Sequence, residues 1–257
     1  MTEHDALINE LSDEPIVGIL GGMGPLATAD FYTKLIASTP ATRDQEHLRV
    51  VMWADPTVPD RTTGLLSGGV DATPWLVRGG QMLAAMGASF IAMPCNTAHA
   101  YLPRVQPQVP IPFLHMMDEA ATAVEIRYPL VERVGLLATT ATVELGLYAE
   151  WFARHHIEVA VPDTVRQALV MEAIAAVKAG NVGTAATARV REAAEYLVGQ
   201  RAELLILGCT ELPLIFGERD APIRVLDPTQ TLAEAAVRKA GRFPNLPHPA
   251  MQEVAHD

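Results

Sequence analysis

The chain has 257 residues, of which 49% are hydrophobic, and its formal net charge is −11. This length is enough for one large domain or two small ones with an apolar core. The negative charge argues against nucleic acid and anionic membrane surfaces as partners, because both would repel the chain. No apolar run is long enough to span a bilayer, and the acidic residues 1–14 lack the apolar segment of a signal peptide. We therefore expect a cytoplasmic protein.

Short apolar runs alternate with longer helical patterns along the chain. Strands are predicted at residues 16–20, 48–53, 90–93, 111–114, 134–137, 157–161, 204–207 and 223–226. Helices are predicted at residues 27–37, 73–86, 117–125, 142–154, 164–179, 184–200 and 229–240. Apolar strands separated by helices are typical of parallel sheets that are covered on both faces. The sequence therefore predicts an α/β fold in which mostly parallel sheets are flanked by helices.

The strand pattern repeats within the chain. Val17-Gly18-Ile19-Leu20 begins the first half and Val134-Gly135-Leu136-Leu137 begins the second, at an offset of 117 residues (134 − 17). We predict two pseudo-symmetric domains. The first comprises residues 1–115 plus a returning helix at 228–242, the second comprises residues 116–227, and residues 243–257 form a flexible tail. Because ligands bind at the carboxyl ends of parallel strands, we expect the active site in the interdomain cleft.

The two cysteines stand in matching frames. Cys95 and Cys209 each follow an apolar run and one turn-forming residue, and their offset of 114 residues (209 − 95) is close to that of the repeat. Two thiols on opposite faces of a carbon acid can act as an acid–base pair. One thiolate removes a proton while the other thiol returns one from the far side, which inverts the carbon. The alternative is two ordinary buried cysteines, since cysteine is among the most buried residue types.

Polar groups that can stabilise a carbanion surround both cysteines. Asn96 and Thr97 follow Cys95, Thr210 follows Cys209, and Thr139 and Thr140 lie after the strand at 134–137. Such donors stabilise the negative charge that develops when Cα loses its proton. The same residue types are common helix caps, and the two roles are compatible because a cap exposes the same backbone amides.

Three further features could hold a carboxylate. The loop Gly21-Gly22-Met23-Gly24-Pro25 permits close backbone approach to an anion, although a plain tight turn explains it equally well. Arg61, in the loop after the second strand, could bind a carboxylate through two hydrogen bonds or could simply be solvated. Lys178, near a predicted helix end, could act similarly or only complement the helix dipole.

Two residues near the cysteines have more than one interpretation. His99 lies one helical turn after Cys95 and could share a metal with it, but no second pair of ligands completes a site, so a packed or capping histidine is favoured. Glu211 could assist Cys209 as an acid–base group, or it could be a first-turn glutamate that the helix dipole favours.

Together these motifs resemble the cofactor-independent aspartate/glutamate racemase superfamily, and most closely its aspartate racemases. The resemblance covers residues 16–240, and its motifs are Gly21-Gly22-Met23-Gly24-Pro25, Val58-Pro59-Asp60-Arg61-Thr62, Met93-Pro94-Cys95-Asn96-Thr97-Ala98-His99, Leu136-Leu137-Ala138-Thr139-Thr140, Val177-Lys178-Ala179-Gly180-Asn181 and Gly208-Cys209-Thr210-Glu211. It implies a homodimer of two-domain subunits with no cofactor and no metal. It also implies that Cys95 and Cys209 are the catalytic acid–bases.

The resemblance further implies an acidic amino acid as the small-molecule partner. Arg61 and Lys178 would bind its side-chain carboxylate, and Asn96, Thr97 and Ala98 would line the pocket for its α-carboxylate and amino groups. The full predicted substrate-binding set is Met23, Gly24, Arg61, Asn96, Thr97, Ala98, Thr139, Thr140, Lys178, Thr210 and Glu211.

The expected activity is pyridoxal-independent interconversion of L- and D-aspartate. Glutamate racemases look similar but usually carry histidine where this chain has Glu211, which favours aspartate. Some relatives replace the first cysteine with threonine and accept many amino acids, whereas Cys95 is intact here, which argues against that broad-specificity branch. The alternatives are a racemase of glutamate or another amino acid, a decarboxylase or cis–trans isomerase on the same scaffold, and a non-catalytic amino-acid-binding module.

Overall fold

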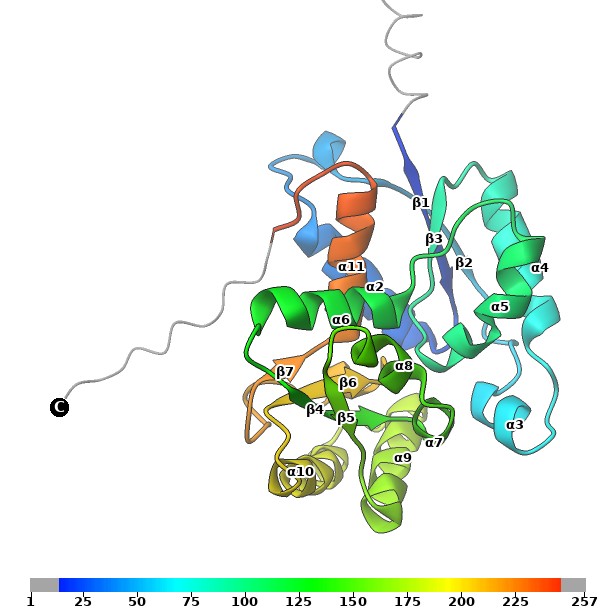
Figure 1. Ribbon diagram of the computed structural model, residues 1–257. Helices are drawn as coiled ribbons and strands as arrows, with labels where there is room; N and C mark the ends of the chain where they lie inside the picture. Colours follow the sequence, from blue (N-terminus) through cyan, green and yellow to red (C-terminus); the bar gives the residue numbers. More distant parts are fainter. Residues whose placement is uncertain (1–13, 246–257) are drawn as a thin grey trace, which may run out of the picture.

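The computed structural model describes residues 14–245, and most of the predicted tail lies outside this range. Its strands are β1 (Ile16–Gly21), β2 (Arg49–Ala54), β3 (Phe90–Ala92), β4 (Arg133–Ala138), β5 (Glu158–Ala160), β6 (Leu204–Gly208) and β7 (Val225–Leu226). They form two sheets with the orders β2-β1-β3 and β5-β4-β6-β7, and every strand pair is parallel (Figure 1). In each sheet the first strand of its half lies between the second and the third, so the predicted α/β fold with pseudo-symmetric sheets is confirmed.

Helices cover both faces of each sheet. The α-helices are α2 (Pro25–Ser38), α3 (Arg61–Leu66), α4 (Thr73–Ala85), α5 (Leu102–Val105), α6 (Met116–Arg127), α7 (Thr140–Glu144), α8 (Leu147–Ala153), α9 (Thr164–Lys178), α10 (Thr184–Gly199) and α11 (Pro228–Lys239). Short 3₁₀ helices occur at η1 (Asp44–Glu46), η2 (Thr97–Tyr101), η3 (Gln106–Gln108) and η4 (Leu212–Leu214). The packing of α4 on β1 and of α9 against α10 places these helices on the outer faces, while α11 packs between α2 and α6 in the middle.

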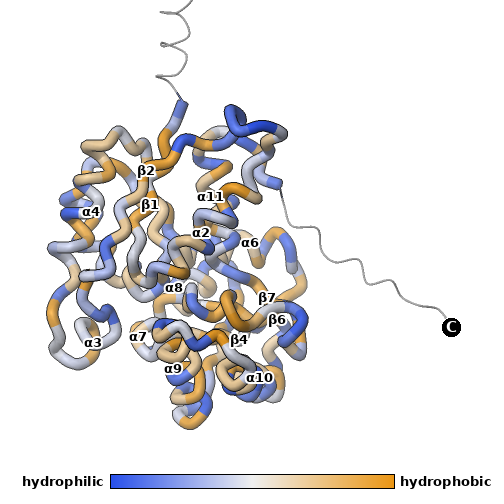
Figure 2. The backbone as a smooth tube through the Cα atoms, turned by 180° about the vertical axis from the view of Figure 1, so that it is seen from behind, coloured by the Kyte–Doolittle hydropathy of each residue, from blue (hydrophilic) through white to orange (hydrophobic). Residues whose placement is uncertain are grey.

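The strand residues alternate between an outer and a central core. In the first sheet Ile19 belongs to the central cluster and Leu20 to the cluster under α4, and in the second sheet Ile206 and Leu205 divide in the same way. This period of two is what a strand buried on both faces requires. The strands accordingly carry mostly hydrophobic residues (Figure 2). The central cluster contains residues of both sheets, so one apolar core holds the two halves together.

The last helix, α11, packs against α2 of the first half and also against α6. Lys34 of α2 forms ion pairs with Asp30 and with Asp227, which caps the N-terminus of α11. Further along α11, the fully buried Glu234 pairs with Arg127 of α6. Because α11 contacts helices of both halves, the domain boundaries at residues 115 and 227 stay a prediction.

The prediction of a single helix at residues 142–154 is wrong. The chain forms α7 and α8 instead, and Gly146 between them has a left-handed φ of 62°. This conformation costs other residues energy, so the glycine ends one helix and begins the next at a new angle. The strand predicted at 111–114 is reduced to one parallel bridge between Phe113 and Ile91.

Arg61 was expected in a loop, but it is the first residue of α3. Asp60 caps this helix by accepting a hydrogen bond from the backbone N–H of Thr63 at 2.8 Å. Asp is a favoured N-cap residue, but a helix of six residues carries too little hydrophobic periodicity to be found from the sequence.

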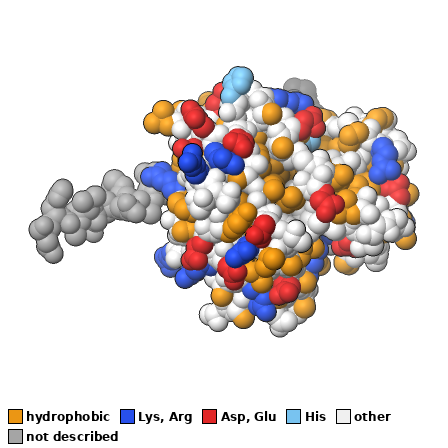
Figure 3. All heavy atoms as spheres, turned by 60° about the horizontal axis from the view of Figure 1, so that its bottom comes forward, with side chains coloured by type: hydrophobic (Ala, Val, Ile, Leu, Met, Phe, Trp, Pro, Cys, Tyr) orange, Lys and Arg blue, Asp and Glu red, His pale blue; other side chains and the backbone are white. Residues whose placement is uncertain are grey.

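On the face shown in Figure 3, acidic and basic side chains are interspersed. Ion pairs such as Arg189 with Glu172 join opposite charges on the exterior of the chain. Among residues 14–245, none of the helices is both long enough and apolar enough to cross a membrane.

Replacing Gly146 with alanine should destabilise the protein by about 1–2 kcal/mol, because only the left-handed φ opposes the new methyl group. A Cβ at this position would meet nothing closer than 4.0 Å. Gly199→Ala is the matched control, since a Cβ there meets nothing within 4 Å and helix α10 should gain about 0.4–1 kcal/mol. Urea unfolding measures both changes, and equal shifts of the two variants would contradict the conformational explanation.

Candidate active site

A small cavity, partly open to solvent, lies where strand ends from both sheets meet. Its lining residues follow β1, β2 and β3 of the first sheet and β4, β5 and β6 of the second. The lining residues are Met23, Asp60, Arg61, Thr62, Cys95, Asn96, Thr97, Thr139, Lys178, Cys209, Thr210 and Glu211. The predicted position at the carboxyl ends of parallel strands agrees with this geometry.

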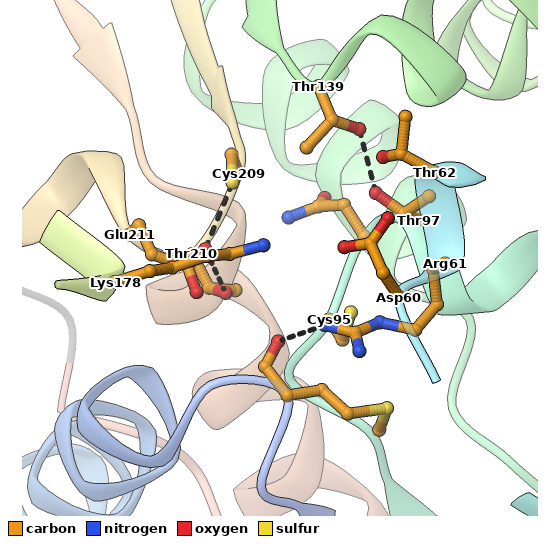
Figure 4. Close-up of a pocket in the computed structure, with 12 residues that line it drawn as sticks. Asp60, Arg61, Thr62, Cys95, Thr97, Thr139, Lys178, Cys209, Thr210 and Glu211 are labelled. Atoms are coloured by element: carbon orange, nitrogen blue, oxygen red, sulfur yellow. Dashed lines mark hydrogen bonds between the residues drawn. The ribbon is translucent and has the colours of Figure 1, made fainter. Parts of the chain in front are cut away.

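Cys95 and Cys209 approach the cavity from opposite sides. Cys95 lies in the turn after β3 and Cys209 directly follows β6, and both are free thiols with 5% of their surface exposed. Figure 4 shows the two side chains entering from the two halves of the molecule. The matched frames in the sequence therefore correspond to facing positions around one cavity.

Glu211 accepts a hydrogen bond from Cys209. The Cys209 thiol donates a hydrogen bond to Glu211 Oε2 at 3.0 Å, and the Thr210 hydroxyl donates to the same oxygen at 3.4 Å. Burial, and then the negative charge of Glu211, raises the pKa of Cys209 well above its ordinary value. Cys209 is therefore a protonated thiol at neutral pH, and its proton is donated in a hydrogen bond to Glu211.

The other oxygen of Glu211 faces the first half of the chain. Oε1 is buried and has no hydrogen-bond partner among the described residues. A side chain at position 24 would come within 3.2 Å of it, so the glycine loop before α2 allows the carboxylate to approach the N-terminus of this helix. The partial positive charge of a helix N-terminus favours a carboxylate there.

Arg61 supplies a buried positive charge on the Cys95 side. Its guanidinium donates hydrogen bonds to the carbonyl oxygens of Val58, Pro59 and Met23 at 3.1–3.3 Å. Burial alone would lower the pKa of Arg61, but the negative charges of Cys95, Asp60 and Glu211 outweigh it, and the net shift is upward.

Threonine hydroxyls connect the two halves beside the cavity. Thr97 from the first half lies 2.8 Å from Thr139 and 3.1 Å from Thr142 of the second, and the latter two are 2.9 Å apart. Thr139 also caps α7 by accepting from the backbone of Thr142. The capping and site interpretations of Thr139 are therefore both satisfied by one residue.

Asn96 has one polar atom free. Its Oδ1 accepts a hydrogen bond from the hydroxyl of Tyr148 at 2.5 Å, while its Nδ2 is buried without a partner among residues 14–245. With Glu211 Oε1, this makes two unpaired buried polar atoms on residues that line the cavity. Native proteins rarely leave such atoms unpaired, so their position indicates a bound molecule.

His99 is a structural histidine. Its Nδ1 lies 2.9 Å from the carbonyl oxygen of Cys95, and its Nε2 accepts from the backbone N–H of Met116 at 3.1 Å. The ring therefore carries its proton on Nδ1 and caps α6 with Nε2. Burial lowers the pKa of His99 to about 4. Both nitrogens are occupied, which is incompatible with sharing a metal with Cys95, and within the described range no cluster of three His, Cys, Asp or Glu side chains could hold a metal.

Three predicted site residues do not line the cavity. Gly24 lies behind Glu211, Ala98 is fully buried in η2, and Thr140 accepts a hydrogen bond from Gln167 of α9 at 3.3 Å. Conversely, Asp60 and Thr62 line it and were not predicted, although they flank Arg61 in the sequence. Lys178, the last residue of α9, also lines the cavity, as predicted.

Known proteins share this fold and this arrangement of strands. The Asp/Glu/hydantoin racemase family matches residues 20–236. The broad specificity amino-acid racemase RacX of Bacillus subtilis is 30% identical over 228 residues, which covers 86% of this chain and 96% of that protein. The structure of an aspartate racemase from Picrophilus torridus superposes with a TM-score of 0.80 at 34% identity, covering 91% of this chain and 96% of that one.

A more distant structure shows the same fold. The glutamate racemase of Francisella tularensis, solved in complex with D-glutamate, superposes with a TM-score of 0.67 at 19% identity over 93% of this chain and 86% of that one. The family match runs from β1 into α11 and so includes both sheets and both cysteine turns. The chain belongs to the Asp/Glu/hydantoin racemase family.

Proposed function

We propose that this racemase interconverts L- and D-aspartate by proton transfer between Cα and two cysteines. The observation that carries the proposal is that Cys95 and Cys209 line one cavity from opposite halves of the fold. A carbon bound between two such groups can lose a proton on one face and gain one on the other. The products are a carbon of inverted configuration and a pair of cysteines whose protonation states have been exchanged.

The surroundings of the two thiols differ. Cys209 donates to Glu211 and so holds a proton to give, whereas Arg61 lies on the Cys95 side of the cavity. In the reaction direction that starts from a protonated Cys209, Cys95 takes the Cα proton and Cys209 protonates the opposite face of the same carbon. Glu211 would then lie beside a new Cys209 thiolate, and the repulsion between them favours rapid return of a proton to the sulfur.

Two cations support an acidic substrate. Arg61 and Lys178 come from the two halves and line the same cavity. A side-chain carboxylate placed between them would gain charge-assisted hydrogen bonds from both. The aspartate racemase of Picrophilus torridus is similar to this chain over most of its length, and this similarity also supports aspartate as the substrate.

A wider substrate range is the second candidate. The intact Cys95 favours aspartate, whereas the similarity to a broad specificity amino-acid racemase, over 96% of that protein's length, supports a wider range. Chiral analysis of the products from a panel of L-amino acids, including glutamate and alanine, distinguishes the two candidates.

The two-base scheme predicts isotope incorporation. In deuterated water, L-aspartate should yield D-aspartate carrying deuterium at Cα. Cys95→Ala and Cys209→Ala should each lower racemisation by about 10²–10⁴-fold, because each removes one proton carrier. Mass spectrometry after chiral separation measures the label, and circular dichroism checks that both variants fold. Wild-type turnover by either variant would overturn the scheme.

Glu211→Gln should lower the pKa of Cys209. The substitution removes a negative charge and weakens an acceptor, so the thiolate should form at lower pH than in the parent, while burial still opposes it. The ultraviolet absorbance of the thiolate, titrated in a Cys95→Ala background, reports Cys209 alone. The exposed Glu195→Gln on α10 is the control and should leave the titration unchanged. An unchanged midpoint in Glu211→Gln would refute the role of the hydrogen bond.

Lys178→Met should raise KM for aspartate by about tenfold, the loss expected for one charge-assisted hydrogen bond. KM for any neutral amino acid that the enzyme accepts should stay nearly constant, because no side-chain carboxylate is present to lose the contact. Lys239→Met, at an exposed position at the end of α11, is the matched control. Steady-state kinetics on both substrates tests this, and an equal loss on both would place Lys178 outside side-chain recognition.

A further inference from the structure

Tyr148 lies between the two cysteine turns, although it does not line the cavity. It is a fully buried residue of α8, and its hydroxyl donates to Asn96 Oδ1 at 2.5 Å. A Cβ at Gly208 would come within 3.2 Å of the Tyr148 ring. Asn96 follows Cys95 and Gly208 precedes Cys209. One side chain therefore contacts the residues adjacent to both thiols.

The hydrogen bond from Tyr148 determines how the Asn96 amide is oriented. A separation of 2.5 Å suits O–H···O, because N–H···O bonds are normally about 2.7–3.2 Å long. Burial, and then the negative charge of Asp227, raises the pKa of Tyr148 well above its ordinary value, so the hydroxyl keeps its proton. With Oδ1 held by the phenol, Nδ2 must lie on the other side of the amide.

The free side of the amide is suited to one kind of ligand group. Asn96 lines the cavity, and its Nδ2 is buried with no partner among the described residues. An amide nitrogen offers two donors and no acceptor. A carboxylate oxygen would satisfy it, whereas a flipped amide would present an oxygen and repel the same carboxylate.

We propose that Tyr148 is a positioning residue, whose hydroxyl fixes the Asn96 amide so that its N–H groups bind the α-carboxylate of the substrate. The proposal rests on the proposed racemase function. Tyr148 acts through Asn96 and does not itself line the cavity. Its ring supports the strand end at Gly208, so the hydroxyl and the ring have separate effects.

Tyr148→Phe keeps the ring and removes only the hydroxyl. KM for aspartate should rise about tenfold, because Asn96 Oδ1 loses its partner and the amide can rotate, while kcat should change by less than about threefold. Tyr196→Phe, a partly buried position on α10 outside the cavity, is the control and should leave both constants unchanged. A large fall in kcat with constant KM would overturn the proposal.

A double-mutant cycle separates this role from a general loss of packing. Asn96→Ala alone should raise KM, and adding Tyr148→Phe in that background should have no further effect, because the contact is already lost. Additive effects of the two substitutions would show that Tyr148 does not act through Asn96 and would reject the proposal. Urea unfolding of all the variants shows which of them are folded at the assay temperature.

An observation that needs no activity distinguishes failure of this proposal from failure of the proposed function. A buried, hydrogen-bonded phenol proton should give a slowly exchanging NMR line that disappears in Tyr148→Phe and shifts in Asn96→Ala. If the wild-type protein racemises no amino acid but this line behaves as expected, the racemase function fails and the contact holds. If the line is absent or is indifferent to Asn96→Ala, the positioning role is wrong whatever the activity.

Discussion

The site depends on one packing constraint, the apolar core shared by the two sheets. The central cluster includes Ile19 and Phe90 from the first sheet and Leu136 and Ile206 from the second, with α11 between them. Burying each of these side chains contributes on the order of 1.5–3 kcal/mol, so the relative position of the sheets is set by many apolar contacts rather than by polar groups at the cavity. The strand ends that carry Cys95 and Cys209 are therefore held at a defined separation without help from the substrate.

The polar groups then act within that fixed frame. Glu211 and Arg61 lie on different sides of the cavity, and each is placed beside a different cysteine. A pseudo-symmetric fold would otherwise give two equivalent thiols, which is a poor starting point for a reaction that needs one acid and one base. The asymmetry comes from charges that the repeat does not share. In the proposed mechanism, the duplicated fold supplies the geometry and the unshared residues supply the direction of proton transfer.

Structural and site roles coincide in several residues. Thr139 caps a helix and also lines the cavity, while His99 holds the Cys95 turn against the start of α6. Because one residue can have both roles, helix caps and site residues are hard to tell apart in the sequence. The turn that follows a parallel strand must satisfy its backbone groups, and the side chains that do so are the ones nearest the ligand.

The amino-acid sequence by itself determined the α/β class, the seven strands of the described residues, most of the helices and the equivalence of the two cysteines, because these features depend on local periodicity and on the repeat. It did not predict the break at Gly146, the short helix that begins at Arg61, or the buried Tyr148 next to Asn96. Only the tertiary structure decided which donors face the cavity. It placed Ala98 and Thr140 outside the lining and brought in Asp60 and Thr62. The physical reason is that a side chain's direction, its burial and its neighbours are set by long-range packing between the sheets, which no local sequence pattern encodes.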